Sequence, residues 1–373
     1  MSLRNYIIRR VLFSIPLILG ISVILFALMV SAPSDYVDVQ YLSNPTMTYE
    51  EQQNLRHNLG LDRPVHEQYV FWLLGRNSRL GDWNNFITEF GDYLIFSPIR
   101  ILQGTGLIDL GFTSSRFTPG FMFGNMGRSF TGSSINELIG AQAWQTIKLQ
   151  LASLIMSLMI GIPLGIFSAR RPYSKLDNIG TTLALFGVSM PVFWTGIMFI
   201  LLFADWKIFF GIKFPSIGAY SYTLTGNEGP IELLIDEFAH MVLPTIVLGL
   251  AGTALILRLT RSSMLEVLRQ DYILTARSKG LPERMVIYKH ALRNALLPVV
   301  TVVGLGIGFL LAGAALTETV FSWPGLGREA VFRINLRDYN FIMGVNMLIS
   351  IMVVIANLIT DITYAFLDPR IRY

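Results

Sequence analysis

The sequence predicts an all-α membrane protein that crosses the bilayer six times, with both termini in the cytoplasm. The first observation is composition: 52% of the 373 residues are hydrophobic and 14% are charged, whereas soluble domains carry about 25% charged residues. The second is that the apolar residues occur in six blocks, each matching the roughly 20 helical residues that span a hydrocarbon core. The third is an uneven distribution of Lys and Arg between the connecting segments.

Each apolar block is expected to form a helix because it is long and carries few charges. The blocks run near residues 11–30, 144–167, 179–203, 241–259, 297–316 and 341–366. Arg9 and Arg10 precede the first block, as basic residues do in a secretory signal. The apolar run is longer than the roughly 7–15 residues of a signal peptide. We therefore expect a retained membrane helix.

Lys and Arg indicate which side of the membrane each connecting segment occupies. Of the 29 Lys and Arg residues, 16 lie in short segments on one side of the predicted spans, eight of them in residues 258–297. Of the other 13, Lys148 lies within the predicted second span, and 12 are spread over the much longer segments of the opposite side. Cytoplasmic loops carry an excess of Lys and Arg, so the dense side is predicted to be cytoplasmic.

The first external segment is long enough to have structure of its own. Thr48 and Glu51 form a capping-box pattern, Gly60 is placed to end that helix, and Pro64 to begin another. This region is either a docking surface for a partner outside the cytoplasm or a passive lid. The predicted division is an N-terminal end with the first helix (1–30), an extracytoplasmic region (31–143) and a core transmembrane domain (144–373).

The third external segment, 317–340, contains a strong turn signal at Pro324 and Gly325. The apolar side chains of Phe321, Trp323 and Leu326 flank this turn. They suit a hairpin that dips into the membrane interface. The alternative is that they are ordinary aromatic anchors at the edge of the bilayer.

The cytoplasmic segment 258–297 predicts two short amphipathic helices that meet at a sharp corner. It begins as a continuation of the fourth span, and residues 271–279 are compatible with a helix. Gly280 can adopt the left-handed conformation that closes a helix, and Pro282 with Glu283 suits the first turn of the next one. Several apolar side chains of this corner need cover from the chain or from a partner: Ile273, Leu274, Met285, Val286 and Ile287.

Several runs of residues, in order along the chain, resemble one known family. They are 58–69 (NLGLDRPVHEQY), 161–165 (GIPLG), 189–194 (SMPVFW), 272–280 (YILTARSKG), 290–298 (HALRNALLP), 318–328 (ETVFSWPGLGR) and 367–372 (LDPRIR). Together they are similar to the permease subunits of ABC importers for oligopeptides and dipeptides, a family that also includes nickel and oligosaccharide systems. The resemblance implies the type I ABC importer fold, with a coupling loop at 258–297.

In this family the coupling loop transmits motion from separate ATPase subunits. The resemblance assigns this role to Tyr272, Leu274, Thr275, Ala276, Arg277, Lys279, Gly280, Leu281, Pro282 and Glu283. It also implies a second related permease subunit, two ATPase subunits that bind ATP and Mg, an extracytoplasmic solute-binding protein, and a multi-pass location in a prokaryotic inner membrane. The sequence contains no Gly-x-x-x-x-Gly-Lys-[Ser/Thr] phosphate loop, so we expect this chain to be non-catalytic and to bind no cofactor.

Mild polar residues within the spans are candidates for a solute pathway. The pathway and gate candidates are Ser189, Met190, Pro191, Trp194, Trp323, Pro324, Asn346 and Ser350, and further mid-span polar residues are Ser153, Ser157, Thr195 and Asn357. The alternative for each hydroxyl and amide is a hydrogen bond that only joins helices.

One departure from the family pattern lies in the first external segment. The family usually passes quickly from the Tyr69 region to a segment best matched here by 107–112 (LIDLGF). Residues 77–104 therefore look inserted, and the sequence assigns them no role.

Two other classes of protein fit less well. An ion-coupled carrier needs ionisable residues near the middle of its spans, but Asp205, Glu318 and Asp361 lie at the ends of the predicted spans. A membrane enzyme is disfavoured because the chain has no Cys and its four His residues are scattered. Within the importer class, the cargo is expected to be an oligopeptide, with an oligosaccharide or a metal chelate as alternatives.

Overall fold

The computed structural model describes residues 3–32, 37–38, 41, 46–77, 117–119, 121–127, 129, 133–203, 214–221 and 229–367. The chain forms two compact units. The first unit contains Met1–Ile18, Ala141–Val331 and Leu348–Tyr373, and the second contains Leu19–Gly140 and Phe332–Met347. Residues 78–104 of the predicted insertion, the segment 107–112, Asp205 and the tail 368–373 lie outside the described residues. The three-part division along the sequence stays a prediction.

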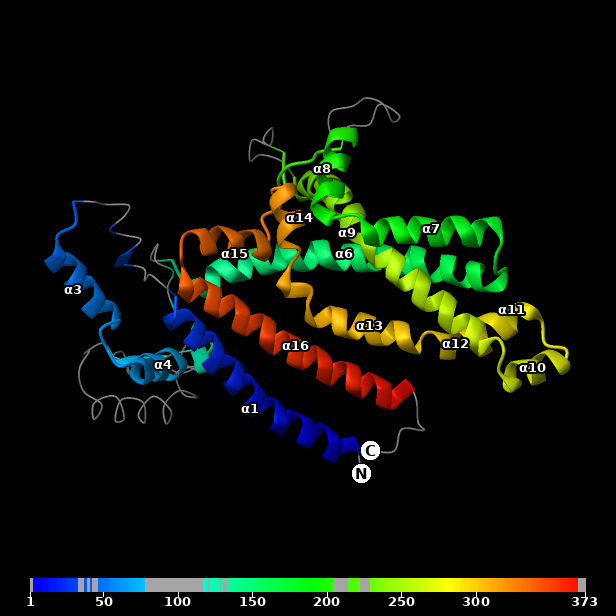
Figure 1. Cartoon of the computed structure of the whole chain (residues 1–373), viewed down its shortest axis with the longest axis horizontal. Helices are drawn as coiled ribbons and strands as arrows, with labels where there is room; N and C mark the ends of the chain where they lie inside the picture. The colour runs from blue at the N-terminus through cyan, green and yellow to red at the C-terminus, as the bar shows by residue number, and fades with distance from the viewer. Residues whose placement is uncertain are drawn as a thin grey trace. The chain divides into compact units, whose positions relative to one another are not determined.

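Four of the predicted spans are single long helices (Figure 1). They are α1 (Leu3–Val30), α6 (Ile135–Arg170), α9 (Pro230–Val267) and α16 (Tyr339–Leu367). Each is long and apolar enough to cross a membrane. The all-α membrane class is thereby confirmed. The described residues also include one short antiparallel ribbon, β1 (Gly75–Asn77) with β2 (Phe117–Pro119), which the sequence did not predict.

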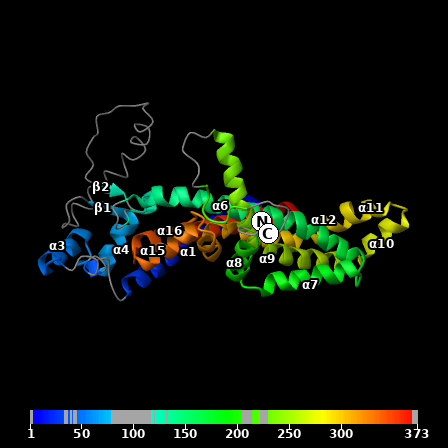
Figure 2. The ribbon, with the colours of Figure 1, turned by 90° about the horizontal axis from the view of Figure 1, so that it is seen from above.

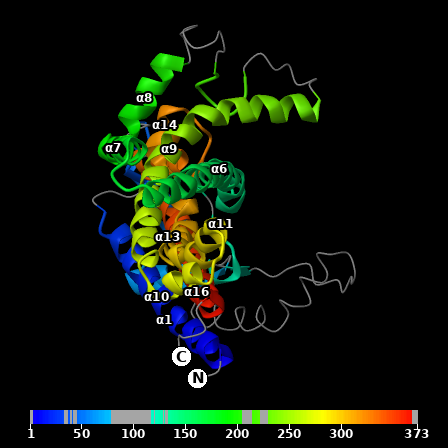
Figure 3. The ribbon, with the colours of Figure 1, turned by 90° about the vertical axis from the view of Figure 1, so that its right-hand side faces the viewer.

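The third predicted span is broken into α7 (Lys175–Ser189) and α8 (Val192–Phe203), which are bent by 106° (Figure 3). The break lies at Met190 and Pro191. A residue before proline disfavours the helical conformation, and Met190 is extended, with φ −81° and ψ 133°. The prediction of one continuous helix over 179–203 was therefore wrong at this point.

The fifth predicted span is also interrupted. A bent pair, Glu283–Ala295 with α13 (Leu297–Gly308), meets at 47°. A 3-10 turn (Leu310–Ala312) follows, then Gly313 at φ 72° and the short helix α14 (Ala315–Val320). A continuous helix over 297–316 was wrong because the chain turns at Gly313. The structure thus contains four spans, or six if each bent pair counts as one, and the count of six stays a prediction.

Helices α6 and α9 approach closely because glycines lie where they meet. A Cβ placed on Gly165 of α6 would lie 2.6 Å from the Cβ of Thr260 on α9, and one on Gly161 would lie 2.9 Å from Ile256. Ser157 of α6 donates a hydrogen bond of 3.0 Å to the carbonyl oxygen of Gly249 on α9. Small residues permit such close packing in membranes. This packing explains the run 161–165 that the sequence singled out.

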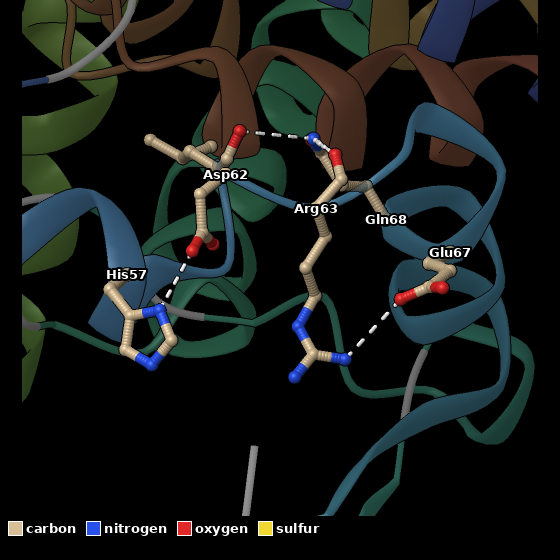
Figure 4. A network of polar contacts seen from close by, with 6 residues as sticks. His57, Asp62, Arg63, Glu67 and Gln68 are labelled. Atoms are coloured by element: carbon tan, nitrogen blue, oxygen red, sulfur yellow. Dashed lines mark hydrogen bonds and ion pairs between the residues drawn. The ribbon is translucent and has the colours of Figure 1, made fainter. Parts of the chain in front are cut away.

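The second unit contains α3 (Tyr49–Leu59) and α4 (Val65–Leu74), joined at a tight corner. The predicted capping box is confirmed: the Glu51 N–H donates to the Thr48 hydroxyl, and the Thr48 N–H donates to the Glu51 carboxylate. Gly60 ends α3 with φ 72°, as predicted. Figure 4 shows the polar contacts at the corner, in which His57 contacts Asp62 at 2.7 Å and Gln68 donates to the carbonyl oxygen of Arg63 at 2.8 Å.

Helix α15 (Leu326–Asn335) follows α14, and its last residues lie in the second unit with the start of α16. There Arg333 donates to the Ser129 hydroxyl at 2.7 Å and to Asp338 at 3.2 Å. All three side chains are buried. This network joins the region before α6 to the α15–α16 connection within the second unit.

Candidate coupling corner and external hairpin

The cytoplasmic segment forms the corner that the sequence predicted. Helix α9 ends at Val267, and α10 (Asp271–Ser278) begins after Gln270. Gly280 has φ 74°, and its N–H donates to the carbonyl oxygen of Arg277 at 2.9 Å. Pro282 then caps α11 (Glu283–Met285). This geometry is confirmed, while the role of the corner in coupling stays a prediction.

The inner face of the corner is covered by the chain itself. Ile273 of α10 is fully buried with Val286 and Ile287 of the π-helical segment (Val286–Ala291). They pack against Met264 of α9 and against Ile166 and Ala169 of α6. Helix α12 (Leu292–Ala295) completes this cluster through Ala295. The corner is therefore packed on the inner ends of α6 and α9, and it lies at the right of Figure 1.

The outer face of the corner keeps exposed apolar side chains. Leu274 is 52% exposed, Tyr272 42% and Met285 40%. Of the five apolar residues that needed cover, two therefore remain available for a partner. The remaining predicted coupling residues are exposed at the rim, except that Ala276 is buried and Leu281 half-buried: Thr275, Arg277, Lys279, Gly280, Pro282 and Glu283.

Arg277 and Glu283 form an ion pair across the corner, with a hydrogen bond of 2.8 Å. The hydrogen bond to Glu283 raises the pKa of the Arg277 guanidinium. Both side chains are well exposed, so this pair adds at most about 1 kcal/mol to stability. It orients the corner more than it stabilises it.

A second ion pair lies just inside the corner, and the sequence analysis missed it. Asp177 in the first turn of α7 accepts two hydrogen bonds from Arg261 of α9, at 2.6 and 2.8 Å. Asp177 is 2% exposed and also accepts from the Tyr173 N–H at 2.8 Å. The pair fastens α7 to α9, which lie side by side (Figure 2). The only sequence signal was an acidic residue near a helix start, and such a signal does not identify a partner 84 residues away.

The aromatic residues of the external hairpin are enclosed by the protein. Trp323 is fully buried, and its Nε1 donates to the carbonyl oxygen of Gln145 on α6 at 3.1 Å. Phe321 and Leu326 are also buried. The interpretation of these residues as anchors at the bilayer edge was therefore wrong. Trp323 faces no open path in this conformation, and its role as a gate, like that of Pro324, stays a prediction.

Beneath this hairpin the carboxyl group of Glu318 is enclosed by polar donors. The Thr146 hydroxyl donates to it at 2.9 Å, and so does the Arg328 N–H. Burial raises the pKa of the Glu318 carboxyl above its usual value, while the donors from Arg328 and Thr146 act in the opposite direction.

The other pathway candidates fall into two groups. Ser189, Pro191 and Trp194 lie exposed at the α7–α8 break, beside half-buried Met190. Asn346, in the second unit, donates to the carbonyl oxygen of Ile342 on its own helix at 2.8 Å. Ser350, in the first unit, is half-buried. Among the further polar residues, Ser153 donates to the Leu149 carbonyl oxygen of its own helix, while Ser157 donates to Ser153 within α6 and to Gly249 of α9. Of these two residues, only Ser157 forms a hydrogen bond that joins helices.

A cavity of about 220 Å³ lies between α6, α9 and α13 in the first unit. Its lining is uncharged and includes Ser153 and Ser157 together with Gln150, which the sequence analysis did not identify. The opposite wall is formed by Val302, Val303 and Gly306 of α13. The lining is mostly apolar, and Gln150, Ser153 and Ser157 are its polar side chains.

Comparison with known proteins places this architecture in a family. The profile described as "Binding-protein-dependent transport system inner membrane component" matches residues 161–373, and the profile of the N-terminal part of such membrane components matches residues 3–79. The chain is 37% identical over 371 residues to the oligopeptide transport system permease protein AppB of Bacillus subtilis, covering 99% of each.

Two further likenesses were found. The chain is 36% identical over 383 residues to the dipeptide transport system permease protein DppB of Escherichia coli K12, again covering 99% of each. Among solved structures, it is similar to the inward-facing MetNI methionine ABC transporter, with 18% identity and a TM-score of 0.45, covering 62% of this chain and 97% of that chain. On the profile matches and the full-length identities, this chain belongs to the family of binding-protein-dependent transport system inner membrane components.

Proposed function

We propose that this chain is the permease subunit of an ATP-driven ABC importer and that its cargo is a peptide. The observation that supports this most strongly is the likeness, over 99% of both chains, to an oligopeptide permease and to a dipeptide permease. Oligosaccharide and metal chelate are the competing cargoes within the same mechanism.

In this proposal the energy is supplied by separate subunits. A second related permease chain would complete the pathway, two ATPase subunits would bind ATP and Mg, and an extracytoplasmic binding protein would deliver the solute. This chain would contribute no catalytic group. The ATPase would contact the corner through exposed apolar side chains such as Leu274 and Met285, which are 52% and 40% exposed.

The mechanism follows from how the corner is connected. An ATPase that moves α10 also moves the cluster of Ile273, Met264 and Ile166, because tightly packed side chains transmit displacement. The inner ends of α6 and α9 therefore move with the corner. The Asp177–Arg261 pair extends this motion to α7. Tilting these helices would alter the cavity between α6, α9 and α13.

Uptake by the complete transporter in vesicles tests the proposal. The vesicles contain ATP, and the proton and sodium gradients are collapsed with ionophores. We expect a labelled peptide, presented with the binding protein, to accumulate under these conditions, and unlabelled peptides to compete where oligosaccharides and metal chelates do not. Uptake that disappears with the gradients would contradict the ATP-driven class and favour an ion-coupled carrier.

A further inference from the structure

The run Glu318–Arg328 folds around the carboxylate of its own first residue. Glu318 is fully buried. One carboxylate oxygen accepts from the Thr146 hydroxyl at 2.9 Å, and the other accepts from the Arg328 N–H at 2.9 Å. The Trp323 N–H donates to the Glu318 carbonyl oxygen at 2.8 Å. Glu318 therefore closes the hairpin twice, through its backbone carbonyl to Trp323 and through its side chain to Arg328.

The glycines of the hairpin are explained by the same carboxylate. A Cβ placed on Gly325 would lie 2.5 and 2.6 Å from the two carboxylate oxygens of Glu318. One placed on Gly327 would lie 2.9 Å from an oxygen of the same group. Neither glycine has a positive φ. At Gly325 the requirement for glycine is therefore space beside the carboxylate, and at Gly327 it is space beside both the carboxylate and the Ala315 backbone, whose Cα would lie 2.9 Å from the added Cβ.

The groups that face the carboxylate are donors. Within the described part of the chain Glu318 forms no ion pair, and the Arg328 guanidinium instead donates to the carbonyl oxygen of Ser322 at 2.7 Å. The Thr146 hydroxyl accepts the Leu326 N–H at 2.7 Å, so its own hydrogen is directed to Glu318. An ionised carboxylate accepts from all these donors, whereas an amide would present its own N–H groups to some of them.

The aromatic residues of the hairpin join different helices. Trp323 donates a hydrogen bond to the Gln145 carbonyl oxygen of α6 and packs against Leu149 of that helix. Phe321 packs against Leu243 and Val247 of α9. A Cβ placed on Gly196 of α8 would lie 3.2 Å from the Phe321 ring. The hairpin therefore touches the N-terminal halves of α6, α8 and α9.

We propose that Glu318 is the positioning residue of a pivot at this hairpin, holding the N-terminal halves of α6, α8 and α9 at fixed spacing during transport. This inference rests on the proposed function, because the coupling corner must move the opposite ends of the same helices. On α9, Leu243 at the hairpin and Met264 at the corner are separated by 21 residues, which is about 31 Å of helix. With α9 held at Leu243 and Val247, the part of α9 that leads to the corner tilts when the corner is displaced, and the tilt changes the cavity.

The test uses the complete transporter with its ATPase subunits and binding protein, reconstituted in vesicles. The variants are Glu318→Gln, Thr146→Val and Thr146→Ser, compared with the wild type. Two quantities are measured on the same sample: ATP hydrolysed and peptide accumulated, each normalised to the amount of complex recovered intact by gel filtration. The ratio of peptide to ATP reports coupling, and the dependence on the concentration of loaded binding protein gives the KM.

We expect Glu318→Gln and Thr146→Val to hydrolyse ATP while accumulating at least tenfold less peptide per ATP, with little change in KM. Thr146→Ser should keep the wild-type ratio, because a serine hydroxyl can donate to Glu318 and accept from Leu326. If Glu318→Gln does not assemble, the comparison of Thr146→Val with Thr146→Ser decides the question.

A pivot predicts a change in the ratio of peptide to ATP. A residue that only stabilises the fold would lower recovery, or lower hydrolysis and uptake together, and leave the ratio unchanged. That result, or equal ratios in the valine and serine variants, would overturn the inference. Failure of the wild type to take up peptide would instead contradict the proposed function.

Discussion

Glycines in this chain meet three distinct physical requirements. The neighbours of each glycine show which requirement applies. Gly280 has a positive φ of 74° and no atom within 4 Å of an added Cβ. Gly165 has ordinary helical geometry, but an added Cβ would collide with Thr260. Gly325 lies against the Glu318 carboxylate. Substitutions at these positions should therefore fail for different reasons.

Gly280 offers the clearest separation of conformation from space. Asn tolerates the left-handed conformation better than other residues, whereas a β-branched residue is strongly disfavoured there. We expect Gly280→Asn to retain most peptide uptake and Gly280→Val to lose it at least tenfold, with both proteins inserted in the membrane at wild-type levels. Uptake by vesicles and membrane content by immunoblot measure the two effects.

The matched substitution isolates the conformation of the corner because no neighbour contacts either side chain at Cβ. Equal uptake by the asparagine and valine variants would show that the left-handed turn is not needed for coupling. The sequence predicted this turn because a Gly close to a Pro is a local signal. The sequence could not predict the enclosure of Glu318, because Thr146 is 172 residues away. A contact over that distance leaves no local sequence signal.

Elements longer than a few turns were largely predictable, while their interruptions were not. Hydropathy sums over a window, so residues 179–203 and 297–316 each looked like one span. The structure breaks the first at Met190 and the second at Gly313, where a proline and a left-handed glycine intervene. Both residues were visible in the sequence, but membrane helices often tolerate Pro and Gly through support from neighbouring helices. Whether they break a helix depends on tertiary contacts.

The packing of α7 on α9 can be tested by a disulfide, because the chain contains no cysteine. A Cβ on Gly187 of α7 would lie 3.7 Å from the Cβ of Ala254 on α9, within the roughly 3.5–4.5 Å range of disulfides. We expect the double variant Gly187→Cys, Ala254→Cys to form the bond on mild oxidation. The measurement is a shift in gel mobility after proteolysis between the two positions, reversed by reductant.

The matched control for this pair is Gly180→Cys with Ala254→Cys. Gly180 lies about two turns earlier on the same helix, and an added Cβ there would contact Leu257 and Ser168 instead. This control should remain reduced. Equal cross-linking of both pairs, or of neither, would contradict the described register of α7 on α9.

At the scale of the whole molecule, charge predicts which face is cytoplasmic. The corner that carries Arg277 and Lys279 belongs to the segment richest in basic residues, and α3 belongs to the long segment of the opposite side. The profile matches at 3–79 and 161–373 leave the intervening residues 80–160 unmatched. Most of the predicted insertion falls in that interval, and the insertion stays a prediction.

Orientation can be measured with single cysteines in the cysteine-free chain. Lys279 and Tyr49 are both exposed. A membrane-impermeant maleimide applied to intact spheroplasts should label Tyr49→Cys and should label Lys279→Cys only after the membrane is permeabilised. The wild-type chain, which contains no cysteine, gives the background labelling for both measurements. Labelling of Lys279→Cys from outside would place the corner on the wrong face for any cytoplasmic ATPase.

The enclosure of Asp177 by Arg261 determines how the inner half of the bundle responds to its ionic surroundings. Salt screens exposed charges over about 8 Å at physiological strength, but it screens buried pairs much less, and Asp177 is 2% exposed. Helices α7 and α9 should therefore stay joined in a concentrated electrolyte, while the exposed Arg277–Glu283 pair loosens. Under the proposed coupling, displacement of the corner would then still reach α7 through this pair when the ionic strength rises.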